Sequence, residues 1–146
     1  MGFPGAGEWQ AVDTLEDIRG HFRRHDPFSG HLGIDILEVG EGYAVAEMPL
    51  DARHRNGMGN AHGGAVFALV DMVFAALSNA DGLYCVNAQT SIAYLNPGRI
   101  GPLRGEARQL RAGRRLSTYE VRVTDADGTL VAAATVTGCE MGVPLP

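Results

Sequence analysis

AVFALVDMVFAAL, residues 65–77, is the longest apolar stretch of the chain, and it contains a single charged residue, Asp71. Its length and its content of Ala, Leu and Met favour a helix over a strand. The helix is apolar on almost every side, so we expect it to be buried on most sides. It is too short to cross a membrane, which takes about 18 or more apolar residues.

Strand patterns flank this helix on both sides. Residues 34–39 and 43–48 are typical of a hairpin turned at Gly40-Glu41-Gly42. Four further strands are expected over 83–95, 103–110, 116–123 and 129–139. An amphipathic helix over 10–25, ended by Asp26 and Pro27, precedes them all. A single apolar helix is best covered by a curved antiparallel sheet of about six strands, so the predicted class is α+β.

The composition is that of an ordinary globular domain, and it restricts the possible partners. With 146 residues and 45% hydrophobic content, the chain can form a core without disulfides or a structural metal. We expect an N-terminal arm with a short helix over 1–29 and one domain over 30–146. The net charge is -5, which argues against a nucleic-acid or membrane binder. Cys85 and Cys139 match no metal-binding spacing, so we expect a cytoplasmic protein without metal or cofactor.

The start of the central helix contains the residue types of a site that binds a carbonyl oxygen. Asn56 precedes His62, Gly63 and Gly64, and the two glycines open the helix. Glycines leave backbone N–H groups accessible, and the helix dipole adds about half a positive charge, so a developing oxyanion can be stabilised there. The alternative is that the glycines only let the helix start close to a strand.

Asp71 is a candidate nucleophile or general base. Burying a lone carboxylate costs several kcal/mol unless it is paired or hydrogen-bonded, so stability gives no reason for an acid in this helix. A carboxylate held near a substrate can attack it or activate water. The alternatives are an Asp on an exposed part of the helix and an Asp satisfied by a buried hydrogen bond.

Distance separates the two candidate groups within one chain. Gly63 and Asp71 are eight residues apart, which is about 12 Å along a helix. A nucleophile and an oxyanion donor must both lie about 3 Å from the atoms of one carbonyl group. A site that uses both therefore joins Gly63 of one subunit to Asp71 of another. Two antiparallel helices related by a two-fold axis would form two such sites per dimer.

The pattern Asn56-x5-His62-Gly63-Gly64-x6-Asp71, with two strands before it and four after, resembles the hotdog-fold acyl-CoA thioesterases of the PaaI type. Tyr94-Leu-x-Pro97, which closes the next strand, belongs to the same resemblance. It covers residues 30 to 141. The family is associated with phenylacetate degradation, and the resemblance implies an acyl-CoA substrate, no cofactor and a homo-oligomer, either a dimer or a homotetramer.

The resemblance also implies roles for individual residues. The amide of Gly63 would polarise the thioester carbonyl with help from Asn56, and Asp71 would attack or activate water from the opposing protomer. Asn87 stands at the position of a water-orienting Ser in some relatives, and its amide can also accept and donate hydrogen bonds. His62 is expected to orient its neighbours by a hydrogen bond rather than to transfer protons.

Three arginines are candidates for holding the phosphates of CoA. Arg99, Arg114 and Arg115 follow turn glycines at strand ends, where a guanidinium can bind phosphate through two parallel hydrogen bonds. The alternative is that they are solvated turn residues. Two other functions stay open: a hydratase or dehydratase of enoyl or hydroxyacyl thioesters, and an acyl-CoA sensor without catalysis. The sequence does not predict the acyl group.

Overall fold

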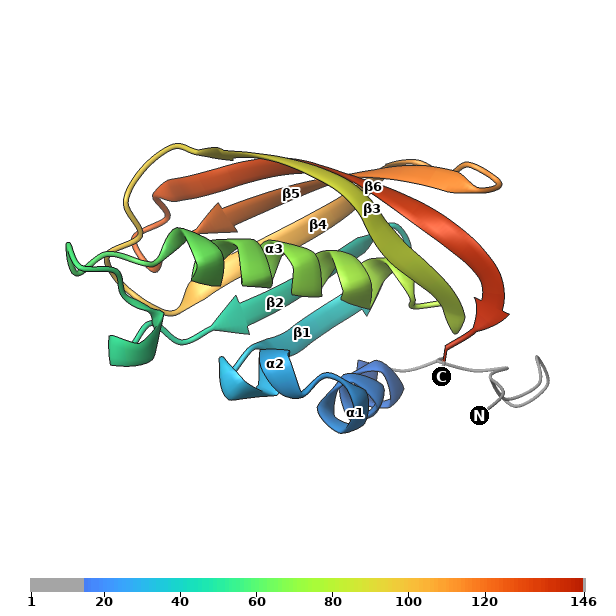
Figure 1. The fold of residues 1–146 in the computed structure, drawn as a ribbon, viewed down its shortest axis with the longest axis horizontal. Helices are drawn as coiled ribbons and strands as arrows, with labels where there is room; N and C mark the ends of the chain where they lie inside the picture. Colours follow the sequence, from blue (N-terminus) through green and yellow to red (C-terminus); the bar gives the residue numbers. More distant parts are fainter. Residues whose placement is uncertain (1–14, 146) are drawn as a thin grey trace.

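The computed structural model describes residues 15–145, in which one curved antiparallel sheet wraps around a long helix (Figure 1). The elements are α1 (Leu15–His25), α2 (Pro27–His31), β1 (Asp35–Gly40), β2 (Tyr43–Met48), the 3-10 helix η2 (Ala52–His54), α3 (Gly63–Ser78), β3 (Leu83–Tyr94), β4 (Leu103–Arg111), β5 (Leu116–Thr124) and β6 (Leu130–Pro144). The strands follow the order β1-β2-β4-β5-β6-β3, and all pairs are antiparallel. The predicted α+β class with a sheet curved around one helix is confirmed.

The helix α3 packs into the concave face of the sheet. Leu69 and Val73 lie against β4 at Gly105, where an added Cβ would come within 3.1 Å of Leu69. Phe74 meets Tyr119 of β5 edge to face, with ring centroids 5.1 Å apart. Burial of each large apolar side chain contributes about 1.5–3 kcal/mol, so the helix and the sheet stabilise each other.

One face of α3 is left uncovered. Gly64, Phe67 and Asp71 are exposed, and their spacing of three and four residues places them on one line along the helix. The expectation that the helix is buried on most sides is correct for the residues that face the sheet and wrong for this line. The reason is that the sheet wraps only one side of α3 and ends at the edge strand β3.

Two short helices precede the sheet where the sequence predicts one. The first ends at His25 as predicted, and residues 10–14 of the predicted helix lie outside the described part of the chain. Asp26 does more than end α1, because it caps α2: its carboxylate accepts hydrogen bonds from the backbone N–H of Ser29 at 3.0 Å and from its hydroxyl at 2.7 Å. Pro27 occupies the first turn of α2, where its missing N–H costs nothing.

The helix α1 packs on the same core as the rest of the chain. Ile18 is 1% exposed and belongs to the main apolar cluster. Arg19 holds Asp35 of β1 with two hydrogen bonds, from Nε at 3.2 Å and from a terminal nitrogen at 2.6 Å. The predicted boundary between an arm and a domain at residues 29 and 30 remains a prediction.

Residues 15–145 contain no helix long and apolar enough to cross a membrane. Within the same residues, no three His, Cys, Asp or Glu side chains lie close enough together to hold a metal ion. Cys85 and Cys139 are free thiols, and burial raises the pKa of the Cys85 thiol to about 12.

Candidate active site

The start of α3 presents the backbone N–H of Gly63, which is free to bind an oxyanion. His62 caps the helix, since its Nδ1 accepts a hydrogen bond from the N–H of Gly64 at 2.9 Å and its carbonyl accepts one from Val66 at 3.0 Å. Among the described residues, nothing accepts from the N–H of Gly63. The helix dipole reinforces this donor. Of the two glycine amides, the one at Gly63 is therefore available for a ligand.

The cap also limits what His62 can do. A ring nitrogen that accepts from a backbone N–H carries no proton, so the proton of a neutral His62 lies on Nε2. The ring thus organises the helix start beside Gly63. This position fits the orienting role that the resemblance implies.

The side chain of Asn56 stabilises a turn in the loop that leads into α3. Its Oδ1 accepts hydrogen bonds from the backbone N–H of Met58 at 2.9 Å and of Asn60 at 3.1 Å. Because the amide oxygen is engaged, the amide nitrogen Nδ2 is left as the group that can meet a ligand, and it has no partner among residues 15–145. Asn56 and Gly63 line one cavity of about 370 Å³.

Tyr94, at the end of β3, belongs to this cavity as well. Its hydroxyl donates a hydrogen bond to the carbonyl of Gly63 at 3.0 Å, and its ring lies 3.5 Å from the place of an added Cβ on Gly63. No role was predicted for Tyr94 beyond its place in the Tyr94-Leu-x-Pro97 motif. Through this hydrogen bond Tyr94 joins the end of β3 to the first residue of α3.

Asp71 is held by a neighbouring strand of its own chain. The Nδ2 of Asn87 donates to Asp71 Oδ1 at 2.9 Å and to Thr90 Oγ1 at 2.7 Å, and the Thr90 hydroxyl lies 3.0 Å from Asn87 Oδ1. The carboxylate is exposed in the single chain, so the alternative of an Asp on an uncovered part of the helix is the observed one. Thr90 is a member of the site that sequence reasoning missed.

A second cavity, of about 480 Å³, lies beside Asp71. Its lining includes Asp71 and Asn87, together with Phe22 of α1, Phe74 of α3 and Tyr84 of β3. The volume lies within the range of about 300–1,000 Å³ that is usual for small-molecule sites. Because three aromatic side chains lie beside the carboxylate, the cavity can bind an apolar group whose attached carbonyl lies near Asp71.

His21 of α1 contributes a neutral ring to the wall of this second cavity. Burial, and to a smaller extent the nearby charges of His25 and Arg24, lower the pKa of His21 to about 4. At neutral pH the ring is therefore uncharged. It adds no positive charge beside the carboxylate of Asp71.

The two halves of the candidate site do not meet within one chain. The cavity at Gly63 and the cavity at Asp71 have separate linings, although both lie along α3. Their separation of eight residues is about 12 Å along this helix. One chain thus offers an oxyanion donor in one place and a carboxylate in another.

The three candidate phosphate-binding arginines do not form one group. Arg99 lies in the loop after β3, near the start of α3, where its carbonyl accepts a hydrogen bond from Arg55. Arg114 and Arg115 lie in the β4–β5 turn, at the opposite end of the sheet (Figure 1). In the single chain only Arg114 and Arg115 lie together, because β4 runs the whole length of the sheet between them and Arg99.

Comparisons with known proteins agree on the family. The sequence model of the thioesterase superfamily matches residues 58–132. The acyl-coenzyme A thioesterase PaaI of Escherichia coli is 34% identical over 109 residues, which are 74% of this chain and 78% of that protein. The proofreading thioesterase EntH of Klebsiella pneumoniae is 35% identical over 101 residues, 67% of this chain and 74% of that one.

Solved structures show the same similarity in three dimensions. The E. coli PaaI structure superposes with a TM-score of 0.84 at 28% identity and covers 90% of this chain and 96% of its own. A Streptococcus mutans protein solved with bound acetyl CoA has a TM-score of 0.71 at 30% identity, with 77% of this chain and 91% of that chain covered.

Proposed function

The chain belongs to the thioesterase superfamily and has the hotdog fold of its PaaI-type members, and we propose that it hydrolyses an acyl- or arylacetyl-CoA thioester to the free acid and CoA. The observation that carries the proposal is the division of the site. A free N–H at Gly63 and a carboxylate at Asp71 occupy different cavities along one helix. Each is one half of a thioester-cleaving centre.

The two halves join when a second copy covers the exposed face of α3. Two such helices packed antiparallel place Gly63 of one protomer near Asp71 of its partner, twice per dimer. The edge strand β3 supports this assembly, because it offers twelve residues with one side unpaired. An unpaired edge of this length is a template for pairing with another strand. Association of two dimers would give the homotetramer expected from the resemblance.

In this arrangement each group has a defined task. The N–H of Gly63, assisted by Asn56 Nδ2, binds the thioester oxygen as it becomes negative. Asp71, oriented by Asn87, either takes a proton from a water molecule that attacks the carbonyl carbon or attacks that carbon itself. In the first route the carbon–sulfur bond breaks, the thiolate of CoA takes up the proton that Asp71 removed from water, and the acid is released. In the second route the thiolate leaves as Asp71 forms a mixed anhydride with the acyl group, and a water molecule then cleaves this anhydride, which gives the acid, the free Asp71 carboxylate and the proton that the thiolate takes up. Hydrolysis in oxygen-labelled water distinguishes the two routes. Only direct attack can place labelled oxygen in the Asp71 carboxylate, because only that route makes the carboxylate part of an anhydride that water cleaves.

The cavity beside Asp71 would hold the acyl group. Its aromatic lining by Phe22, Phe74 and Tyr84 supports a ring or a compact chain, in line with a place in phenylacetate degradation. The cytoplasm is the expected compartment, because free thiols such as Cys85 and Cys139 are usual where the medium is reducing. An arginine would bind the phosphates of CoA. Arg99 is the candidate, because it lies in the loop after β3, next to the cavity that Gly63 lines.

Mixing two inactive variants tests the shared site directly. Asp71→Asn removes the carboxylate, and Gly63→Val shields the N–H with a side chain. Each variant alone should hydrolyse phenylacetyl-CoA at least about 100-fold more slowly than the wild type. Refolded together in equal amounts, they should regain about a quarter of the wild-type rate, because one hybrid site in two is intact and half of the dimers are hybrids.

No regain of activity on mixing would contradict a site shared between protomers. A refolded mixture of wild type and Asp71→Asn serves as the control for losses during refolding. Release of free thiol from the thioester is the readout, which also separates hydrolysis from the two alternatives. A hydratase would change the acyl chain with the thioester intact, and a sensor would bind acyl-CoA without turnover.

A further inference from the structure

The segment from Asp51 to His62 connects β2 to α3 with almost no regular structure. It carries Asn56 and ends at the cap of α3, so its shape decides where two of the candidate donors lie. Irregular backbone of this kind moves easily unless side chains hold it. Two consecutive residues, His54 and Arg55, hold this one.

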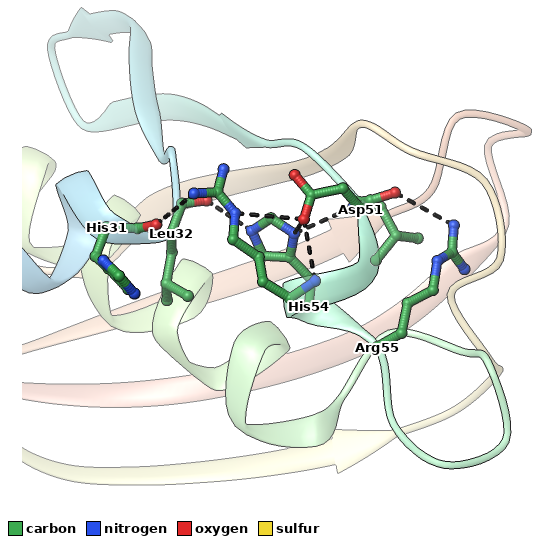
Figure 2. Close-up of polar contacts among 7 residues, drawn as sticks. His31, Leu32, Asp51, His54 and Arg55 are labelled. Carbon is green, nitrogen blue, oxygen red and sulfur yellow. Dashed lines mark hydrogen bonds and ion pairs between the residues drawn. The ribbon is translucent and has the colours of Figure 1, made fainter.

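His54 is completely buried and uses both ring nitrogens (Figure 2). Its Nε2 lies 2.7 Å from the carbonyl oxygen of Leu32, in the connection before β1, and donates to it. Its Nδ1 accepts a hydrogen bond from the backbone N–H of Asp51 at 3.1 Å. The backbone carbonyl of His54 in turn accepts from the N–H of His62 at 2.7 Å. One residue thus ties the start of the segment, its end and a distant loop together.

Arg55 holds the other side of the segment. Its guanidinium donates to the carbonyl of Gly59 at 2.7 Å, of Leu50 at 3.2 Å and of Arg99 at 3.3 Å. These carbonyls belong to the tip of the segment, to the residue just before it and to the loop after β3. Charged hydrogen bonds are stronger than neutral ones, so a planar guanidinium with three acceptors fixes their relative positions well.

We propose that His54 and Arg55 are positioning residues for the oxyanion donors, acting through His62 and Gly59 on the N–H of Gly63 and the amide of Asn56. Neither side chain lines the cavity at Gly63, so neither touches the substrate there. Their effect is on geometry. The inference rests on the proposed function, because it assigns these residues to the thioesterase site.

The expected size of the effect follows from what misplacement does to catalysis. A shift of about 1 Å in a catalytic group can lower the rate by about 100-fold, whereas ground-state binding depends less on it. Loss of either side chain should therefore lower kcat by about 10- to 100-fold and change KM by less than about threefold. A purely structural role would lower the melting temperature and leave kcat of the folded protein unchanged.

Matched variants separate the contacts. His54→Asn keeps an acceptor near the position of Nδ1 and loses the bond to Leu32, whereas His54→Gln can keep that bond and loses the one from Asp51. Arg55→Ala removes all three bonds, and Arg55→Lys restores at most part of them. Arg53→Ala is the control, because Arg53 lies in the same turn and donates to the carbonyl of His31 without touching the loop tip.

Two measurements are made on every variant well below its melting temperature. The first is kcat and KM with phenylacetyl-CoA. The second is backbone amide hydrogen exchange, which needs no activity, at His62, whose N–H is bonded to the His54 carbonyl, and at Gly59, whose N–H is bonded to the Asn56 carbonyl. We expect lower kcat for Arg55→Ala and for at least one His54 variant, with faster exchange at Gly59 in the former and at His62 in the latter. Arg55→Lys should recover part of both values, and Arg53→Ala should keep the wild-type values.

The inference is overturned if kcat stays within twofold of the Arg53→Ala control, or if kcat falls while exchange is unchanged at His62 in the His54 variants and at Gly59 in Arg55→Ala. If the His54 variants do not fold, the test rests on the variants of Arg55, which is only partly buried. Failure of the proposed function looks different, because Asp71→Asn would then hydrolyse the thioester at the wild-type rate. In that case only the hydrogen-exchange measurement shows whether His54 and Arg55 hold the segment before α3 in place.

Discussion

Asn87 and Asp71, sixteen residues apart in the chain, meet through a hydrogen bond of 2.9 Å from the Asn87 amide to the Asp71 carboxylate. A β-bulge between Asn87 and Gln89 makes this arrangement. In a regular strand, residues 87 and 90 would point to opposite faces, but the extra residue brings Asn87 and Thr90 to the same side, where they bond to each other. The carboxylate is thus oriented by a pair of side chains rather than by one.

This pair predicts how Asn87→Ala behaves. Loss of the amide frees the carboxylate to rotate, so kcat for thioester hydrolysis should fall by about 10-fold, the effect of one lost orienting bond to a charged group. Thr90→Val should lower kcat less than Asn87→Ala does, because Thr90 contacts Asp71 only through Asn87. Gln89→Ala, a change at the exposed side of the bulge, is the control. Equal kcat in Asn87→Ala and Gln89→Ala would show that Asn87 has no part in the reaction.

The bond from Tyr94 to Gly63 leads to a second prediction. Tyr94→Phe keeps the ring against the helix start and removes only the hydroxyl that donates to the Gly63 carbonyl. We expect kcat to fall about three- to tenfold with little change in stability, since the side chain is exposed and one neutral hydrogen bond contributes about 1 kcal/mol. Steady-state kinetics and thermal unfolding check it. A large loss of stability without loss of kcat would contradict a positioning role.

The wall of the cavity beside Asp71 should determine the accepted chain length. Phe22→Ala opens that wall, so the ratio of kcat/KM for octanoyl-CoA over phenylacetyl-CoA should rise by about 10-fold, the usual gain for one or two accommodated methylene groups. Phe28→Ala is the matched control, because Phe28 is 63% exposed and outside the cavity. The same ratio in both variants would place the acyl group elsewhere.

A crowded glycine gives a prediction of stability. A Cβ on Gly138 of β6 would come within 2.8 Å of the Cys85 sulfur and 3.1 Å of both Phe74 and Tyr119. Gly138→Ala should lower the free energy of unfolding by about 1–3 kcal/mol, the cost of overpacking a core. Gly30→Ala, with no neighbour within 4 Å, should leave it unchanged or slightly raised. Urea unfolding of the two variants measures the difference.

The buried His21 predicts a loss of stability in acid. Its pKa is about 4 in the folded chain, below the ordinary 6.5, so the unfolded chain binds the proton more readily. Stability that depends on a neutral His21 is present above about pH 6.5 and declines as the pH falls towards 4. The decline reaches about 3 kcal/mol for a shift of this size. The free energy of unfolding is measured with urea at pH 7 and at pH 4.5. It should change less between these two pH values for His21→Gln than for the wild type.

Much of this protein could be predicted from its sequence, because periodicity and turn residues are local. The apolar run around Asp71 and the alternating strands lead to a helix inside a curved antiparallel sheet, and the spacing of Gly63 and Asp71 shows that one helix cannot bring them to one carbonyl. The same local rules missed α2, since Asp26 and Pro27 both end one helix and begin the next.

Contacts between distant segments were decided only by the tertiary structure. The bulge in β3 reverses which residues face Asp71, and no alternation pattern reveals where a strand gains a residue. The exposure of Asp71 depends on where the sheet stops, which follows from the strand order. The burial of His54 between Leu32 and Asp51 is likewise a product of packing, since its neighbours in the chain are as polar as those of any surface histidine.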